Sequence, residues 1–217
     1  MNLPNRLTLA RICIIPFFMV FMLVKIPFPY DGEFFCRICA ALIFLAAAIT
    51  DHIDGKIARE RNMVTDLGKF LDPLADKMMV LGALIGLVVL ASGGIGDVEG
   101  DVYMRLTALL SFIVLFRELA VTSLRLAVVS GKSGKVIAAN ILGKIKTVVQ
   151  IVFVMIALLE PVVFGGHLLG QIKPLSFVAE HHLLSYIAMF LVALMTVWSG
   201  IDYFKAYLPL IISKKQP

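Results

Sequence analysis

Four aspartates at helical spacing are the residues of this chain best suited to chemistry. Asp51 and Asp54 lie three positions apart and Asp72 and Asp76 four, so on α-helices each pair occupies one side of its own helix. The connection between the pairs is short, which predicts that the two helices are antiparallel neighbours. Four converging carboxylates repel one another unless a cation neutralises them. The spacing therefore predicts a site for Mg²⁺ or Mn²⁺, and two such ions would suit a displacement at phosphorus.

Small and basic residues follow the first aspartate pair. Gly55 and Ala58 each come one helical turn after an aspartate and leave room for a ligand, although small residues also serve close helix packing in membranes. Arg59 suits a phosphate because its guanidinium forks, although a snorkelling arginine is the alternative. Their grouping with the carboxylates favours a ligand site. Asp66, beside Thr65 at an expected helix start, is predicted to be a cap instead.

A second polar cluster lies later in the chain. Arg117 and Glu118 fall inside an apolar segment, where ionisable residues are candidate functional groups. As sequence neighbours they are not expected to face one another as a helical ion pair, whereas Glu118 and Arg125 share a face. Together with Lys135 and Lys144 they predict a pocket for a second anion, which favours an acceptor alcohol that carries a phosphate. For the lysines, attraction to anionic lipid is the alternative explanation.

The elements that position these residues are apolar helices. Of the 217 residues, 60% are hydrophobic, whereas typical soluble domains have about 45–50% apolar residues. Without a linker to divide it, we expect one membrane-embedded domain over 1–217, all-α, with a longer loop at 160–182. The six apolar segments that predict transmembrane helices lie near 7–25, 34–58, 68–92, 104–129, 141–163 and 182–204.

The distribution of basic residues predicts the orientation. Most lysines and arginines, Arg11 and Lys146 among them, fall on one side of the predicted spans, and the opposite side carries mixed charge. The positive-inside rule then places both termini in the cytoplasm. It places both polar clusters on that face too. A multi-pass protein of the cytoplasmic (inner) membrane, with its active site facing the cytoplasm, is the expectation.

The aspartates belong to a longer pattern, D-x2-D-G-x2-A-R-x8-G-x3-D-x3-D, which runs from Asp51 to Asp76. This pattern resembles the signature of the CDP-alcohol phosphatidyltransferases, integral membrane enzymes of phospholipid synthesis. The resemblance implies that Asp51, Asp54 and Asp72 hold two cations, with Asp72 bridging them. It implies that Asp76 is both a metal ligand and the general base. The residues it implies for the CDP-lipid are Asn5, Thr8, Gly55, Ala58, Arg59, Thr65 and Gly68.

The stretches RELAVTSLR, GKIKT and NLPNRLTLARICIIPFF resemble the branch of that family that forms phosphatidylglycerol phosphate. This implies CDP-diacylglycerol and sn-glycerol 3-phosphate as substrates, CMP as a product, a homodimer among membrane lipid, and no nucleic-acid partner. Transfer to an inositol phosphate is the alternative within the family. A metal-dependent hydrolase is another alternative, as is a transporter, although related halves or broken helices are not evident.

Overall fold

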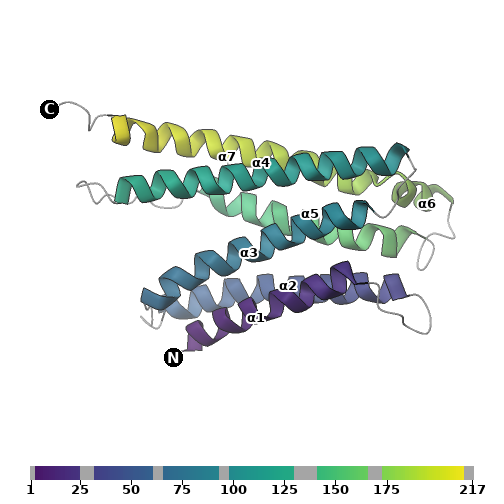
Figure 1. Ribbon diagram of the computed structural model, residues 1–217, viewed down its shortest axis with the longest axis horizontal. Coiled ribbons are helices and arrows are strands. Elements are labelled where there is room, and N and C mark those ends of the chain that lie inside the picture. Colours follow the sequence, from purple (N-terminus) through teal and green to yellow (C-terminus); the bar gives the residue numbers. More distant parts are fainter. Residues whose placement is uncertain are drawn as a thin grey trace.

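The computed structural model describes residues 3–24, 32–60, 66–92, 98–129, 141–165 and 173–212. Every secondary-structure element in these ranges is an α-helix, which confirms the predicted fold class (Figure 1). The helices are α1 (Leu3–Leu23), α2 (Gly32–Glu60), α3 (Asp66–Ala91), α4 (Val98–Val129), α5 (Ile141–Phe164), α6 (Lys173–Glu180) and α7 (Leu183–Ile212).

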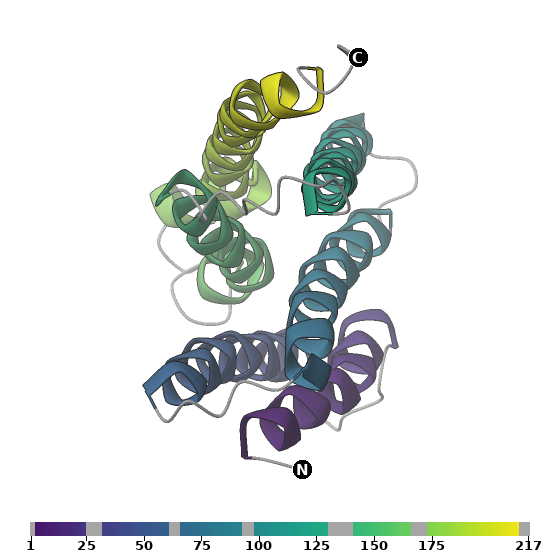
Figure 2. The ribbon, with the colours of Figure 1, turned by 90° about the vertical axis from the view of Figure 1, so that its left-hand side faces the viewer.

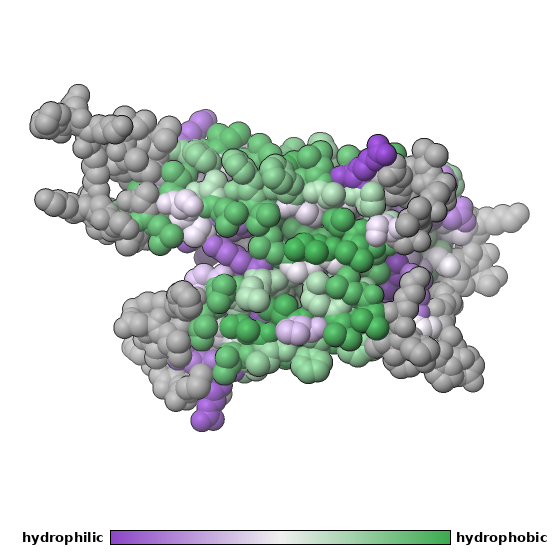
Figure 3. All heavy atoms as spheres, in the orientation of Figure 1, coloured by the Kyte–Doolittle hydropathy of each residue, from purple (hydrophilic) through white to green (hydrophobic). Residues whose placement is uncertain are grey.

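Six of these helices, all but α6, are long and apolar enough to cross a membrane. Their apolar windows run from 19 to 25 residues, and a bilayer core needs about 20. Large side chains such as Phe112, Phe190 and Trp198 are exposed on these helices. Figure 3 shows hydrophobic residues over the middle of the molecule and hydrophilic residues toward its two ends. The prediction of six transmembrane helices is confirmed, and the arrangement fits a multi-pass membrane protein.

The helix boundaries differ from the predicted segments at several ends. α7 continues to Ile212, whereas the predicted segment ended near 204, and α4 begins at Val98 instead of near 104. The expected loop at 160–182 was wrong in part, because α5 runs on to Phe164 and α6 spans eight residues of it. A hydropathy window ends where polar residues begin, but helical backbone hydrogen bonds can continue through them.

The helices form two packed groups. α1 packs against α2 and α3, and α7 packs against α4 and α5. Contacts of α3 with α4 and of α2 with α5 join the groups, which Figure 2 shows from the end that carries both chain termini. Asp51 near the end of α2, Asp72 near the start of α3 and Lys144 near the start of α5 all belong to that end.

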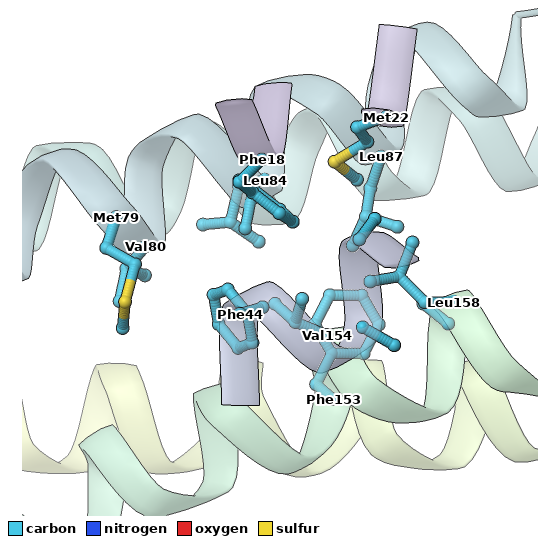
Figure 4. Packing of buried hydrophobic residues seen from close by; sticks show 14 of the residues in the cluster. Phe18, Met22, Phe44, Met79, Val80, Leu84, Leu87, Phe153, Val154 and Leu158 are labelled. Atoms are coloured by element: carbon cyan, nitrogen blue, oxygen red, sulfur yellow. The ribbon is translucent and has the colours of Figure 1, made fainter. Parts of the chain in front are cut away.

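The largest hydrophobic cluster holds the two groups together. Phe18 of α1 and Phe44 of α2 lie with their ring centroids 5.5 Å apart, and Leu84 of α3 and Phe153 of α5 belong to the same buried set (Figure 4). Lipid tails are as apolar as these side chains, so close van der Waals packing and not water exclusion stabilises the arrangement. The packing fixes α3 relative to α5, which both carry site residues.

A buried carboxylate caps the start of α7. Glu160 of α5 is 2% exposed, and its oxygens accept hydrogen bonds from the backbone N–H groups of Leu184 (2.8 Å) and Ser185 (2.9 Å) and from the Ser185 hydroxyl. The first N–H groups of a helix lack partners within the helix, and an acid is favoured at that end. Glu160 thus fixes α7, whose far end carries Tyr203, to α5.

Replacing Glu160 with Ala should destabilise the protein, because three donors lose their acceptor in a buried place. Each such group costs about 1–3 kcal/mol, so a total loss of about 2–4 kcal/mol is expected after partial relaxation. Thermal unfolding in detergent measures it. Glu180→Ala, at an exposed acid of α6, is the matched control and should leave the melting temperature unchanged. Equal melting of the two variants would contradict the capping role.

Candidate active site

One aspartate of α2 and one of α3 are held by residues of α1. The Thr8 hydroxyl donates a hydrogen bond of 2.6 Å to Asp72 Oδ1. The guanidinium of Arg11 forms an ion pair with the Asp51 carboxylate, and Thr8 and Arg11 are themselves buried. The start of α1 therefore positions one carboxylate from each motif helix.

This arrangement corrects the expected packing of the motif helices. α1 packs extensively against both α2 and α3, whereas α2 and α3 have few contacts with each other among the described residues. The short connection brings the end of α2 and the start of α3 to one end of the molecule, but both helices pack on α1. Arg11, about one helical turn after Thr8 on α1, can then reach Asp51. The side chain of Asp51 is 40% exposed.

The described carboxylates fit a hard divalent cation in ligand type, since carboxylate oxygens are what Mg²⁺ and Mn²⁺ prefer. Asp51 already faces one cationic group, the guanidinium of Arg11. Among the described side chains no three acidic, histidine or cysteine residues gather closely enough to hold a metal ion. The side chain of Asp54, the fourth predicted ligand, lies outside the described residues.

The residues predicted to bind the CDP-lipid fall into two sets. Asn5 and Thr8 are buried on α1, and Gly68 is buried on α3 near the aspartates. The backbone of 55–59 continues α2, but the side chains of Ala58 and Arg59 lie outside the described residues, as does the whole of Thr65. The structure therefore brings part of the predicted set to the aspartate end and leaves the rest as a prediction.

A cavity of about 300 Å³ joins the second polar cluster to Asp76. It opens among α3, α4, α5 and α7, and Figure 3 shows hydrophilic residues in the hollow between the two helix groups at that end. Lys135 lies outside the described residues. The polar and charged residues that line the cavity are Asp76, Lys77, Arg117, Glu118, Arg125, Lys144, Lys146, Thr147, Gln150 and Tyr203.

Glu118 pairs with two of the cations in this cavity. Arg117 Nη1 donates to Glu118 Oε1 at 3.1 Å, and Lys146 forms an ion pair with the same oxygen. The expectation that Arg117 and Glu118 would not pair was wrong. Both side chains turn into the cavity, and the arginine is long enough to reach the carboxylate of its neighbour. Arg117 also donates from Nη2 to Ser199 Oγ of α7 at 3.0 Å.

Tyr203 of α7 supplies an aromatic wall behind the arginines. The guanidinium carbons of Arg117 and Arg125 lie 5.2 and 5.8 Å from its ring centroid, within the range of a cation–π interaction. Arg125 and Lys144 are exposed, and neither has a carboxylate partner among the described side chains. Among the described cations of the cavity, these two are therefore available to an incoming anion.

Lys77, adjacent to Asp76, is directed toward α4. Its Nζ donates to Thr122 Oγ1 at 2.6 Å, and that hydroxyl donates to the Glu118 backbone carbonyl at 2.7 Å. This links α3 to α4 beside the cavity. The lysine is thus held by a polar partner within the protein, which leaves Asp76 as the acid of this part of α3 that lines the cavity.

Sequence reasoning missed several residues of the site. Arg11 and Lys146 were counted as topological charges, yet they are 2% and 4% exposed. The rule that singled out Arg117, an ion within an apolar segment, applies equally to them and could have found them. Tyr203 and Gln150 gave no such signal, because an isolated aromatic or amide in an apolar helix has no distinctive spacing.

Comparison with known proteins gives consistent similarities. A family model described as CDP-alcohol phosphatidyltransferase matches residues 1–198, which include both polar clusters. The chain is 39% identical over 210 residues to the CDP-diacylglycerol–glycerol-3-phosphate 3-phosphatidyltransferase of Bacillus subtilis, covering 94% of this chain and 93% of that protein. It is 34% identical over 207 residues to the protein of the same name from Rickettsia bellii, covering 94% of each.

Proposed function

The chain belongs to the CDP-alcohol phosphatidyltransferase family, and we propose from this that it transfers the phosphatidyl group of CDP-diacylglycerol to sn-glycerol 3-phosphate. The products are phosphatidylglycerol phosphate and CMP. The observation that carries the choice of acceptor is the cavity in which Asp76 lies with Arg125 and Lys144. An acceptor that presents a hydroxyl at one end and a phosphate at the other matches a carboxylate and two available cations in one space.

In the proposed reaction the acceptor phosphate binds Arg125 and Lys144 near the mouth of the cavity. This holds the primary hydroxyl of glycerol 3-phosphate near Asp76, whose carboxylate takes the hydroxyl proton. The hydroxyl oxygen forms a bond to the phosphorus that carries diacylglycerol, and the bond from that phosphorus to the oxygen of CMP breaks. CMP leaves with the bonding electrons, so this chain forms no covalent intermediate.

The family is generally dependent on divalent metals. Asp51, Asp54, Asp72 and Asp76 would hold two ions, Mg²⁺ or Mn²⁺, which when bound neutralise the diphosphate of the CDP-lipid. The role of Thr8 is to orient Asp72 through its 2.6 Å hydrogen bond. The ion pair of Arg11 similarly keeps Asp51 directed toward the site. Asn5, Gly55, Ala58, Arg59, Thr65 and Gly68 are proposed to border the CDP-lipid.

Thr8→Val should weaken metal binding, because Asp72 loses the donor that orients it. Hydrogen-bonded groups behind metal ligands contribute about 10–100-fold in affinity, and a loss in that range is expected. Calorimetric titration of the purified protein with Mn²⁺ measures it without turnover. Thr50→Val is the matched control, since the Thr50 hydroxyl donates to the Ala46 carbonyl of its own helix. An unchanged Mn²⁺ affinity in Thr8→Val would contradict the orienting role.

The bacterial relatives suggest the inner membrane as the location. We propose that the end with both chain termini faces the cytoplasm, where CDP-linked and phosphorylated substrates are available, and that the protein acts as a homodimer. Cysteine labelling at the two chain ends in sealed vesicles tests the orientation. Labelling only from the side opposite the cytoplasm would contradict it.

The acceptor is tested with purified protein, CDP-diacylglycerol and Mg²⁺, by following CMP. Release of CMP should require sn-glycerol 3-phosphate, and phosphatidylglycerol phosphate should form with it. Release without an acceptor would indicate a hydrolase. Faster release with inositol phosphate would indicate the other branch of the family, and no release with any acceptor would support transport in place of catalysis.

A further inference from the structure

We infer that Gln150 recognises the secondary hydroxyl of the acceptor and so selects a vicinal diol phosphate over a simple hydroxyalkyl phosphate. Gln150 lies on α5, lines the same cavity as Asp76 and Arg125, and is 3% exposed. The inference rests on the proposed function, since it assigns the remaining group of that acceptor.

The amide nitrogen of Gln150 is buried and has no hydrogen-bond partner among the described residues. Buried polar atoms in folded proteins are almost always paired, because an unpaired donor is destabilising. An unpaired amide that borders a cavity is therefore suited to a partner that arrives with the ligand. Thr147, one turn from Gly143 on the same helix, differs in this respect, because its hydroxyl donates to the Gly143 carbonyl at 3.2 Å.

The ligand group that suits this amide follows from the other charges of the cavity. Glycerol 3-phosphate has a primary hydroxyl, a secondary hydroxyl and a phosphate. The phosphate matches Arg125 and Lys144, which are exposed and have no carboxylate partner among the described side chains. The primary hydroxyl must lie near Asp76 to react. A neutral amide donor is left for the neutral secondary hydroxyl, whose oxygen accepts the bond.

Two cations that line the cavity with Gln150 already have partners within the protein. Lys146 lies one helical turn before Gln150, and its ammonium is paired with Glu118. Arg117, on α4, is held through its two terminal nitrogens by Glu118 and by Ser199, and its Nε has no partner among the described residues. Glu118 thus engages both inner cations with a single carboxylate, and the amide of Gln150 is a neutral donor in this part of the cavity that has no partner among the described residues.

Selectivity of this kind is strong when a site is built to bond a hydroxyl, because an analogue without the hydroxyl leaves the donor unpaired. We expect the wild-type protein to prefer sn-glycerol 3-phosphate to 3-hydroxypropyl phosphate, which lacks only the secondary hydroxyl, by about 10–100-fold in kcat/KM. Gln150→Met, which keeps the side-chain length without the amide, should reduce that preference to about 2-fold or less by lowering kcat/KM for glycerol 3-phosphate alone.

The experiment measures kcat/KM for both acceptors in wild type, Gln150→Met and Thr147→Val, with CMP release as readout. Thr147→Val is the matched control and should keep the wild-type ratio, because its hydroxyl already has a partner. If Gln150→Met impairs both acceptors equally, so that the ratio of their kcat/KM values is unchanged, the inference is overturned. Gln150 would then have a structural role or bind a water molecule. Wild-type protein alone also tests it, since equal kcat/KM for the two acceptors overturns it even if Gln150→Met does not fold.

These outcomes differ from failure of the proposed function. If wild type releases CMP with neither acceptor, the proposed function is wrong and the inference fails with it. If wild type uses glycerol 3-phosphate but does not distinguish the two acceptors, the function stands and only the role of Gln150 fails.

Discussion

Asp76→Asn should abolish formation of phosphatidylglycerol phosphate while nucleotide binding is largely retained. Among the described side chains, Asp76 is the aspartate that lines the cavity together with the basic residues, which places it between the aspartate end and the acceptor. General-base catalysis contributes about 10²–10⁴-fold, and a loss of at least that size in kcat is expected because a proposed metal ligand is altered too. Asparagine keeps the shape of the side chain but cannot take the proton.

The measurement for Asp76→Asn is CMP release at saturating acceptor, together with equilibrium binding of CDP-diacylglycerol. Asp66→Asn is the matched control, because it makes the same change at the first residue of α3, where the sequence predicts a cap and asparagine caps as well as aspartate. That variant should keep its activity. Turnover by Asp76→Asn near the wild-type rate would exclude Asp76 as the base.

Arg125→Ala should raise KM for sn-glycerol 3-phosphate by about 10–100-fold and change kcat less, since a charged hydrogen bond contributes about 1.5–3 kcal/mol. Arg125 is exposed at the cavity and rests on the Tyr203 ring, with no carboxylate partner among the described side chains. Arg117, in contrast, is already held by Glu118 and Ser199. High acceptor concentration should restore most of the rate of Arg125→Ala.

Steady-state kinetics over a range of glycerol 3-phosphate concentrations measure the effect of Arg125→Ala. Lys205→Ala removes an exposed cation of α7 and is the matched control for a general loss of positive charge. Arg125→Lys should recover only part of the affinity, because an ammonium lacks the planar fork that matches phosphate. An acceptor KM in Arg125→Ala equal to that of Lys205→Ala would remove Arg125 from the acceptor site.

Much of the fold was predictable because the physical signal is local. An apolar run of about 20 residues specifies a membrane helix wherever its neighbours lie. The eight-residue α6 was missed because it is far too short for that signal. The start of α4 and the end of α7 were missed because these helices extend beyond their apolar segments. The side of the membrane on which the site lies stays a prediction from basic residues.

The site was predictable to a smaller extent. Spacing identified Asp76 and Arg125, the position inside an apolar segment identified Arg117, and the structure places all three on one cavity. Spacing could not reveal that α1 holds Asp51 and Asp72, because the partners are 40 and 64 residues away along the chain. Contacts of this kind depend on which helices pack together, and several packings are compatible with the same apolar pattern.

Glu118 is the residue whose contacts in the structure differ most from its predicted role. From sequence it belonged to a group of phosphate-binding residues, but in the structure its carboxylate joins Arg117 and Lys146. A carboxylate would repel a phosphate, so its role changes from contact with the acceptor to pairing with the two inner cations. Only the tertiary structure distinguishes the cations that are paired from those that are available.

The most direct test uses sn-glycerol 3-phosphate labelled with ¹⁸O at its primary hydroxyl, CDP-diacylglycerol and the purified protein, with products analysed by mass spectrometry. Direct attack of that hydroxyl on the phosphorus that carries diacylglycerol predicts phosphatidylglycerol phosphate that retains the ¹⁸O, and CMP that contains none. Label in CMP, unlabelled lipid product, or release of phosphatidic acid in place of phosphatidylglycerol phosphate would contradict the account.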